Sequence, residues 1–116
     1  MCEEKSIYND GTLEARVVEP GHNYCVNCLW EDDGQVFTDY MASLEFQNGP
    51  VNEAGINGIQ NEPVIAILID RLKFLDSKFP SYHNKMAIIS LESALQHLIN
   101  RTKDRIERGV EGVNLA

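Results

Sequence analysis

The sequence predicts an α+β fold, with a small antiparallel β-sheet in its N-terminal half and an antiparallel two-helix hairpin in its C-terminal half. Before residue 46, apolar and polar residues alternate as they do in half-buried strands. After residue 61, apolar residues recur at helical spacing, and a Gly/Asn-rich stretch separates the two patterns. A chain of 116 residues suits one domain, and it would bury more apolar surface as an oligomer.

The sheet is expected to contain three or four short strands. Alternating, β-branched and aromatic residues predict strands at 13–17, 24–30 and 36–46, while turn-forming compositions at 19–23 and 31–34 separate them. The neighbours of each turn are close in sequence, so we expect the strands to pair in antiparallel fashion.

A connector without a helix is expected at residues 47–60, because glycine and asparagine recur there too irregularly for helical packing. Two places remain open for a short strand in it, Val51–Asn52 and Ile56–Ile59. Together, residues 1–60 would form the sheet and connector of the single domain.

The hairpin is expected over residues 61–109, followed by a tail at 110–116 that is ordered only against a partner. The first helix would begin at Asn61 as its N-cap and end at Ser77–Pro80. The second would start after Ser81 and continue to Arg108, with Gly109 as its C-terminal cap. The positions expected to be buried are Ile65, Leu68, Ile69, Leu72 and Leu75, then Ile88, Leu91, Leu95, Leu98, Ile99, Thr102 and Ile106.

The charge distribution argues against polyanionic partners. The net charge is −8, and nucleic acids and anionic membranes are bound chiefly through lysine and arginine, so we expect no DNA, RNA or membrane partner. Residues 1–62 carry twelve acids against two bases, whereas residues 63–116 carry six acids against eight bases. A binding site for an anion is therefore expected in the C-terminal half.

The cysteines do not predict a metal or a disulfide framework. Cys25 and Cys28 follow His22 at metal-like spacing, but a structural zinc needs four ligands and the pair lies inside an expected strand. With neither a signal peptide nor an apolar run long enough for a membrane helix, a soluble protein in a reducing compartment is expected. No nucleophile elbow or phosphate loop is found, and we expect neither catalysis nor a cofactor.

The end of the second expected helix carries the feature most suggestive of a ligand. Arg101, Arg105 and Arg108 fall at positions i, i+4 and i+7 and so share one face. They fit two interpretations: complementing the helix dipole with surface ion pairs, or binding phosphates through planar donors. Phe74 offers a ring for base stacking, and Asn84 offers donors and acceptors for a base or ribose.

Three runs of the chain, Phe46–Glu62, Ile65–Leu72 and Leu98–Gly112, resemble the phage Thoeris anti-defence family, and the hairpin is similar to that of the anti-CBASS cyclic-nucleotide sponges. The resemblance implies a phage protein in the cytoplasm of the infected bacterial host that binds glycocyclic ADP-ribose and stores it uncleaved. It also implies a homodimer assembling further into a hexamer, with cyclic di- or trinucleotides bound at a separate site. The implied ligand-binding residues are Phe74, Asn84, Arg101 and Arg105, with Lys85 and Arg108 at the second site.

Helix geometry adds an independent constraint on such a pocket. Asn84 and Arg101 are seventeen residues apart, which corresponds to about 26 Å along one helix. If both contact one nucleotide, at least two chains must build the pocket in two equivalent copies. The alternative function is a structural or interaction module that binds an acidic partner protein through the basic helix face.

Overall fold

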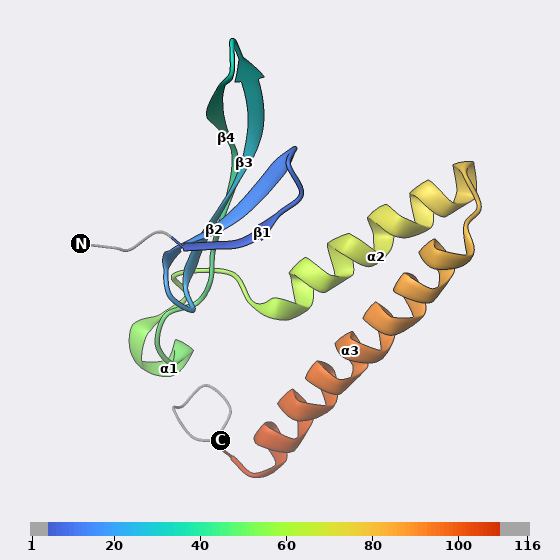
Figure 1. Ribbon diagram of the computed structural model, residues 1–116. Helices are drawn as coiled ribbons and strands as arrows, with labels where there is room; N and C mark the ends of the chain where they lie inside the picture. The colour runs from blue at the N-terminus through green and yellow to red at the C-terminus, as the bar shows by residue number, and fades with distance from the viewer. Residues whose placement is uncertain (1–4, 110–116) are drawn as a thin grey trace. The chain divides into compact units, whose positions relative to one another are not determined.

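The computed structural model describes residues 5–109, which form four strands followed by three helices. Figure 1 shows their arrangement along the chain. The contacts divide the chain into two compact units. One unit contains the sheet together with residues 56–59, and the other contains the helices with residues 49–55. The predicted α+β class is confirmed. The expected tail at 110–116 lies outside the described residues.

The sheet is antiparallel throughout, and its strands are adjacent in sequence order β1-β2-β3-β4. Its strands are β1 Lys5–Asn9, β2 Leu13–Glu19, β3 Asn23–Asp32 and β4 Gln35–Glu45. The prediction missed β1, because all five of its residues are exposed and it lacks a clean apolar alternation. Pairing with β2, which extends from Lys5 opposite Val17 to Asn9 opposite Glu14, holds this strand in place.

The turns between β2 and β3 and between β3 and β4 fall where the composition predicted them, whereas the turn between β1 and β2 was not predicted. Asp33 and Gly34 connect β3 to β4 with φ angles of 52° and 78°. Positive φ at both central positions matches the twist of a two-residue hairpin, and Asp and Gly adopt it at low cost. Asp32 and Gln35 are therefore directly paired at the end of the ladder.

The connector contains a short helix, α1 Val51–Ala54, so the expectations of a helix-free connector and of a strand at Val51–Asn52 are wrong. Of the alternative strand at Ile56–Ile59, only Ile59 forms a bridge, parallel to Phe46. Gly58 permits this approach, because a Cβ atom there would lie 2.5–2.7 Å from backbone atoms of residues 45–47. The side chain of Asn57 also binds the backbone N–H and carbonyl of Asn48 at 2.8 and 2.7 Å.

Two long helices, α2 Asn61–Lys78 and α3 Tyr82–Glu107, form the predicted hairpin. Ser81 caps α3 by accepting a hydrogen bond from the backbone N–H of Asn84 at 3.3 Å. Asn61 is not the N-cap of α2 as expected. It is the first helical residue, and Gln60 precedes it in an extended conformation without a side-chain cap.

The covered residues of α3 recur every 3.5 residues on average, so they form a narrower stripe than the one we expected. Its members are at least half-buried and alternate in steps of four and three, as in a coiled-coil seam. Ile99, Ile106 and Leu68 of α2 fall outside the covered sides and are 36%, 59% and 45% exposed, which contradicts their predicted burial. The seam residues of α3 are Asn84, Ile88, Leu91, Leu95, Leu98, Thr102 and Arg105.

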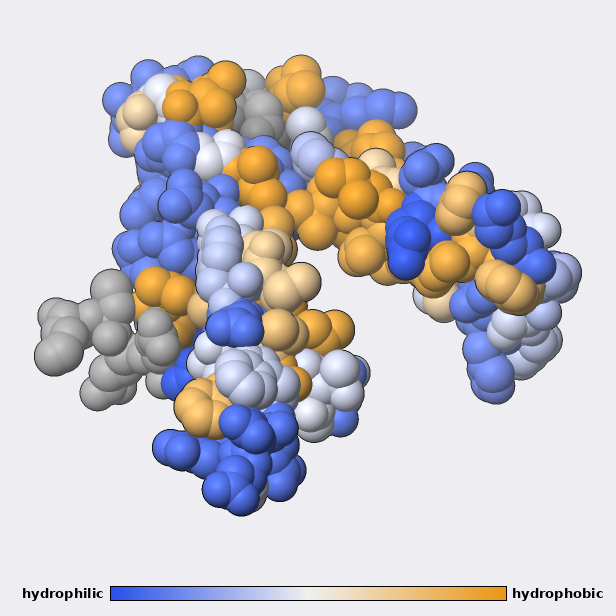
Figure 2. All heavy atoms as spheres, turned by 90° about the horizontal axis from the view of Figure 1, so that it is seen from above, coloured by the Kyte–Doolittle hydropathy of each residue, from blue (hydrophilic) through white to orange (hydrophobic). Residues whose placement is uncertain are grey.

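Neither unit encloses a substantial apolar core. Among the described residues, Ile69 and Ile88 are the buried hydrophobic side chains, each 8% exposed. Figure 2 accordingly shows apolar side chains at the surface of the visible face. Large exposed apolar surface is uncommon on stable monomers. This exposed apolar surface is a physical reason to expect the oligomer that the sequence predicts. Oligomerisation itself stays a prediction.

Candidate functional site

The loop end of the helical hairpin presents exposed aromatic side chains. Phe74, in the last turns of α2, is 52% exposed, and the ammonium of Lys78 lies 5.2 Å from its ring centroid. Phe79 and Tyr82 flank the turn and are 74% and 71% exposed. These rings are therefore open to a stacking partner instead of filling a core.

The same end of the hairpin holds Asn84 and Lys85 at the start of α3. Asn84 is half-buried on the covered seam. The ammonium of Lys85 lies 3.1 Å from the carboxylate of Asp76, which also accepts a hydrogen bond from the backbone N–H of Ser81 at 2.9 Å. The Ser81 N–H and then Lys85 lower the pKa of Asp76 below its usual value. Lys85 thus stabilises the hairpin turn through its ion pair with Asp76, although about half of its side chain is exposed.

Three arginines occupy the opposite end of α3, each in a different state. Arg101 is exposed and forms no hydrogen bond or ion pair with the described part of the chain. Arg105 is only 8% exposed and takes the last position of the seam. Arg108 donates from Nε to a carboxylate oxygen of Asp104 at 3.0 Å. Of these three arginines, Arg101 is the one that is exposed and has no ion pair with the described residues.

The expected site residues fall into two groups that one chain does not bring together. Phe74, Asn84 and Lys85 lie at the loop end, and the arginines lie at the far end of α3. Because α3 runs without a break from Tyr82 to Glu107, Asn84 and Arg101 are about 26 Å apart along its axis.

A shallow groove of about 300 Å³ lies between these two groups, where α2 packs on α3. Its rim includes the carboxylate of Glu92, which pairs with the ammonium of Lys73 at 3.3 Å. None of the residues expected to bind a ligand lines it. The lining residues are Ala66, Ile69, Glu92, Leu95, Gln96 and Ile99.

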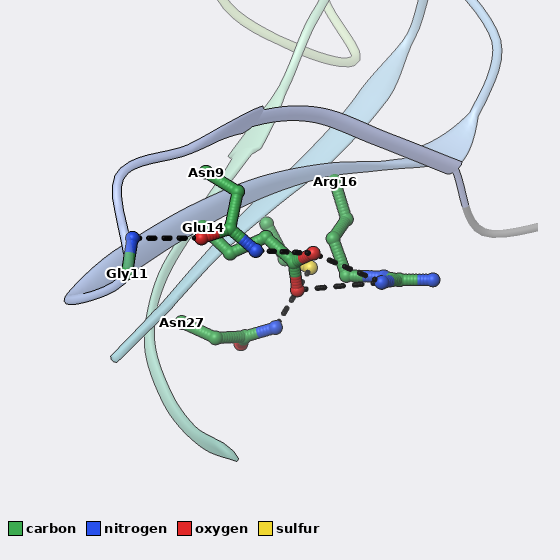
Figure 3. Close-up of polar contacts among 6 residues, drawn as sticks. Asn9, Gly11, Glu14, Arg16 and Asn27 are labelled. Carbon is green, nitrogen blue, oxygen red and sulfur yellow. Dashed lines mark hydrogen bonds and ion pairs between the residues drawn. The ribbon is translucent and has the colours of Figure 1, made fainter. Parts of the chain in front are cut away.

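The sheet carries a buried polar cluster that the sequence analysis missed (Figure 3). Its centre is Glu14 on β2, which is 7% exposed. Arg16 donates from Nη1 to both carboxylate oxygens of Glu14 at 3.3 Å, and Asn9 donates to one of them at 3.5 Å. A hydrogen bond from Ser6 is the largest of the contributions that lower the pKa of Glu14, against the opposing effect of burial. The sequence signal that could have identified this cluster is the pair Glu14 and Arg16, two residues apart on one strand and therefore on the same face of the sheet.

Cys25 and Cys28 lie on opposite faces of β3. Cys25 is paired with Arg16, on the face of the polar cluster, whereas Cys28 is paired with Leu13. Successive residues of a strand alternate between faces, so a spacing of three separates the two thiols. This pair is not arranged to share one metal ion. Residues 5–109 contain no group of three His, Cys, Asp or Glu side chains placed to hold a metal.

Among the described residues, no helix has the length and apolar character needed to cross a bilayer.

Comparison with known proteins provides one informative relative. No protein-family model matches the chain. A protein named Thoeris anti-defense 1, from Bacillus phage SBSphiJ7, is 48% identical over 79 residues. The matched part is 67% of this chain, which spans about 56% of the length of that relative.

Proposed function

We propose that the chain acts as a phage sponge, a protein that binds and sequesters a host signal. The premise is its relation to the Thoeris anti-defence family, which its similarity to the Bacillus phage protein shows. It binds glycocyclic ADP-ribose, the signal of the host Thoeris system, and keeps it from the effector without cleaving it. The protein acts in the cytoplasm of the infected bacterium. The single observation that carries this proposal is the 48% identity to a protein named for Thoeris anti-defence.

The chemistry of the hairpin supports such a ligand. A cyclic ADP-ribose combines a purine, which stacks on an aromatic ring, with a diphosphate, which prefers the planar fork of arginine. Phe74 is exposed for the first role, and Arg101 is exposed for the second, without a partner among the described residues. Arg105 continues the phosphate-binding row toward the end of α3, and Asn84 supplies the polar contact at the loop end.

The pocket requires two chains. A nucleotide of about half the length of the 26 Å between Asn84 and Arg101 cannot contact both in one hairpin. Two antiparallel hairpins bring the loop end of one chain to the arginine end of its partner. Two equivalent pockets then follow from the two-fold symmetry. We propose a homodimer of this kind, which assembles further into a hexamer.

Tight binding also favours a closed interface. A dissociation constant near 1 nM corresponds to about 12 kcal/mol of net binding free energy. Two charge-assisted contacts and one stacked base, each worth about 1–3 kcal/mol, approach that value only in a preorganised pocket screened from water. The surface of an isolated hairpin does not provide such screening, whereas the interface of a dimer does.

A second ligand class belongs to the same proposal. Lys85 and Arg108 are cationic and partly exposed, and we assign them to a separate site for cyclic di- or trinucleotides, which also needs two chains because the two residues lie at opposite ends of α3. Each already pairs with an acid, Asp76 and Asp104 respectively, at 3.1 and 3.0 Å. A phosphate would have to compete with these carboxylates, so we expect weaker binding there than at the main pocket.

The test is to mix the purified protein with glycocyclic ADP-ribose, remove free ligand, release the bound fraction by heat and identify it by mass spectrometry. Intact ligand at stoichiometric yield supports the sponge. A hydrolysed product would instead indicate an enzyme. Absence of binding would favour the alternative, an interaction module whose basic helix face contacts an acidic protein.

A further inference from the structure

We infer that His97 is a third phosphate-binding side chain in the pocket that Arg101 and Arg105 begin. This inference rests on the proposed function and extends it by one residue. His97 lies on α3 one helical turn before Arg101. It is exposed, and it forms no hydrogen bond, ion pair or ring contact with the described part of the chain.

The geometry of α3 directs Arg101 toward His97. Positions i and i+4 are neighbours on a helix surface, with Cβ atoms about 6 Å apart. Long helical side chains lean toward the N-terminus, over the residues three and four positions earlier. For Arg101 these residues are Leu98 and His97. Leaning in this direction, the guanidinium of Arg101 can reach the side of α3 that carries His97, so that one phosphate can accept hydrogen bonds from both.

Nothing bulky on the preceding turn of α3 covers the imidazole. The residues three and four positions before His97 are Ala94 and Ser93, and both are exposed. Their small side chains leave the ring open to solvent on the side toward which it leans. A diphosphate has several oxygens that accept hydrogen bonds, so an exposed N–H donor at His97 can bind one of them.

Helix electrostatics give a physical reason for a further hydrogen-bond donor. The C-terminal end of a helix carries a partial negative charge, which repels an anionic ligand. The last turns of α3 also contain Asp104 and Glu107, and Asp104 engages Arg108 at 3.0 Å. A diphosphate at Arg101 therefore needs a further hydrogen-bond donor, and an N–H of the His97 imidazole supplies one close to the ligand.

Lys103 provides a matched control, because it is an exposed cation near Arg101. At 100° per residue, Lys103 lies about 120° around α3 from His97. Removing it changes the net charge without removing a donor from this face. An effect of general electrostatics would appear in both variants, whereas a direct contact would appear only at His97.

The experiment measures the affinity of the full chain for glycocyclic ADP-ribose by titration calorimetry, with melting temperatures recorded for each variant. We expect His97→Ala to weaken binding by about tenfold or more at an unchanged melting temperature, and Lys103→Ala to weaken it by less than about threefold. His97→Gln retains an N–H donor, so its affinity should lie between those of the parent and His97→Ala.

Two results would overturn the inference, and they differ in meaning. If the parent binds and His97→Ala binds equally well, or if Lys103→Ala loses as much, the phosphate site does not include His97 while the sponge function stands. If the parent binds no cyclic ADP-ribose isomer, both the function and this inference fail.

Discussion

Replacing Arg101 with alanine separates ligand binding from folding, because the structure places this side chain on the surface without an ion pair to any described residue. Loss of an exposed, unpaired side chain usually changes the free energy of unfolding by less than about 0.5 kcal/mol. Loss of a charge-assisted contact to a phosphate should cost about 2–4 kcal/mol of binding free energy. The variant should therefore fold like the parent and bind roughly 30- to 1000-fold more weakly.

Titration calorimetry with glycocyclic ADP-ribose measures the affinity, and denaturant unfolding measures the stability. Arg101→Lys should recover only part of the lost affinity, since lysine keeps the charge but not the planar fork. Arg105 is a poorer first test. It is 8% exposed and ends the seam of α3, so its removal would affect packing as well as binding. Parent-like affinity in the Arg101→Ala variant would refute the assignment of the phosphates to this end of α3.

The remaining predictions concern assembly, the thiols, the polar cluster and the connector. Sedimentation at micromolar concentration should give a dimer or a multiple of dimers, and a monomer that still binds the ligand would contradict the shared pocket. Replacing Cys25 and Cys28 with serine should leave the affinity within about tenfold, or 1.4 kcal/mol, in calorimetry, because neither thiol is assigned to the pocket. Since the folded state lowers the pKa of Glu14, its stabilising contribution is present above the unfolded pKa, and acid unfolding monitored by circular dichroism should show it lost as the pH falls through the folded pKa. Glu14→Gln should reduce this pH dependence, and an unchanged acid transition would contradict it. Gly58→Ala should lower the melting temperature, because its Cβ would lie 2.5–2.7 Å from the backbone of residues 45–47; an unaltered melting curve would show that the connector adjusts easily.

Arg105 shows what the local sequence pattern predicts about the site and what depends on tertiary contacts. Spacing alone put Arg101, Arg105 and Arg108 on one face of a helix; α3 contains the first two, and Arg108, expected within the helix, is its C-cap. Which guanidinium is buried depends on what covers the helix, and no local pattern reports that. Placement of the ligand at these residues was predicted from the family resemblance and stays a prediction.

The sequence by itself determined the fold class, the two turns that connect β2, β3 and β4, and both long helices, because these follow from short-range signals. Alternation predicts strands, Asp33-Gly34 predicts a hairpin turn, and Ser81 predicts the start of α3. It missed β1 because all five residues of that strand are exposed, and it missed the cluster around Glu14 because the short spacing to Arg16 does not report that this carboxylate is buried. Only the tertiary structure decided that Ile99 and Ile106 are exposed while Arg105 is covered. Helical periodicity identifies which residues share a face, but the side of the helix that is buried is set by what packs against it.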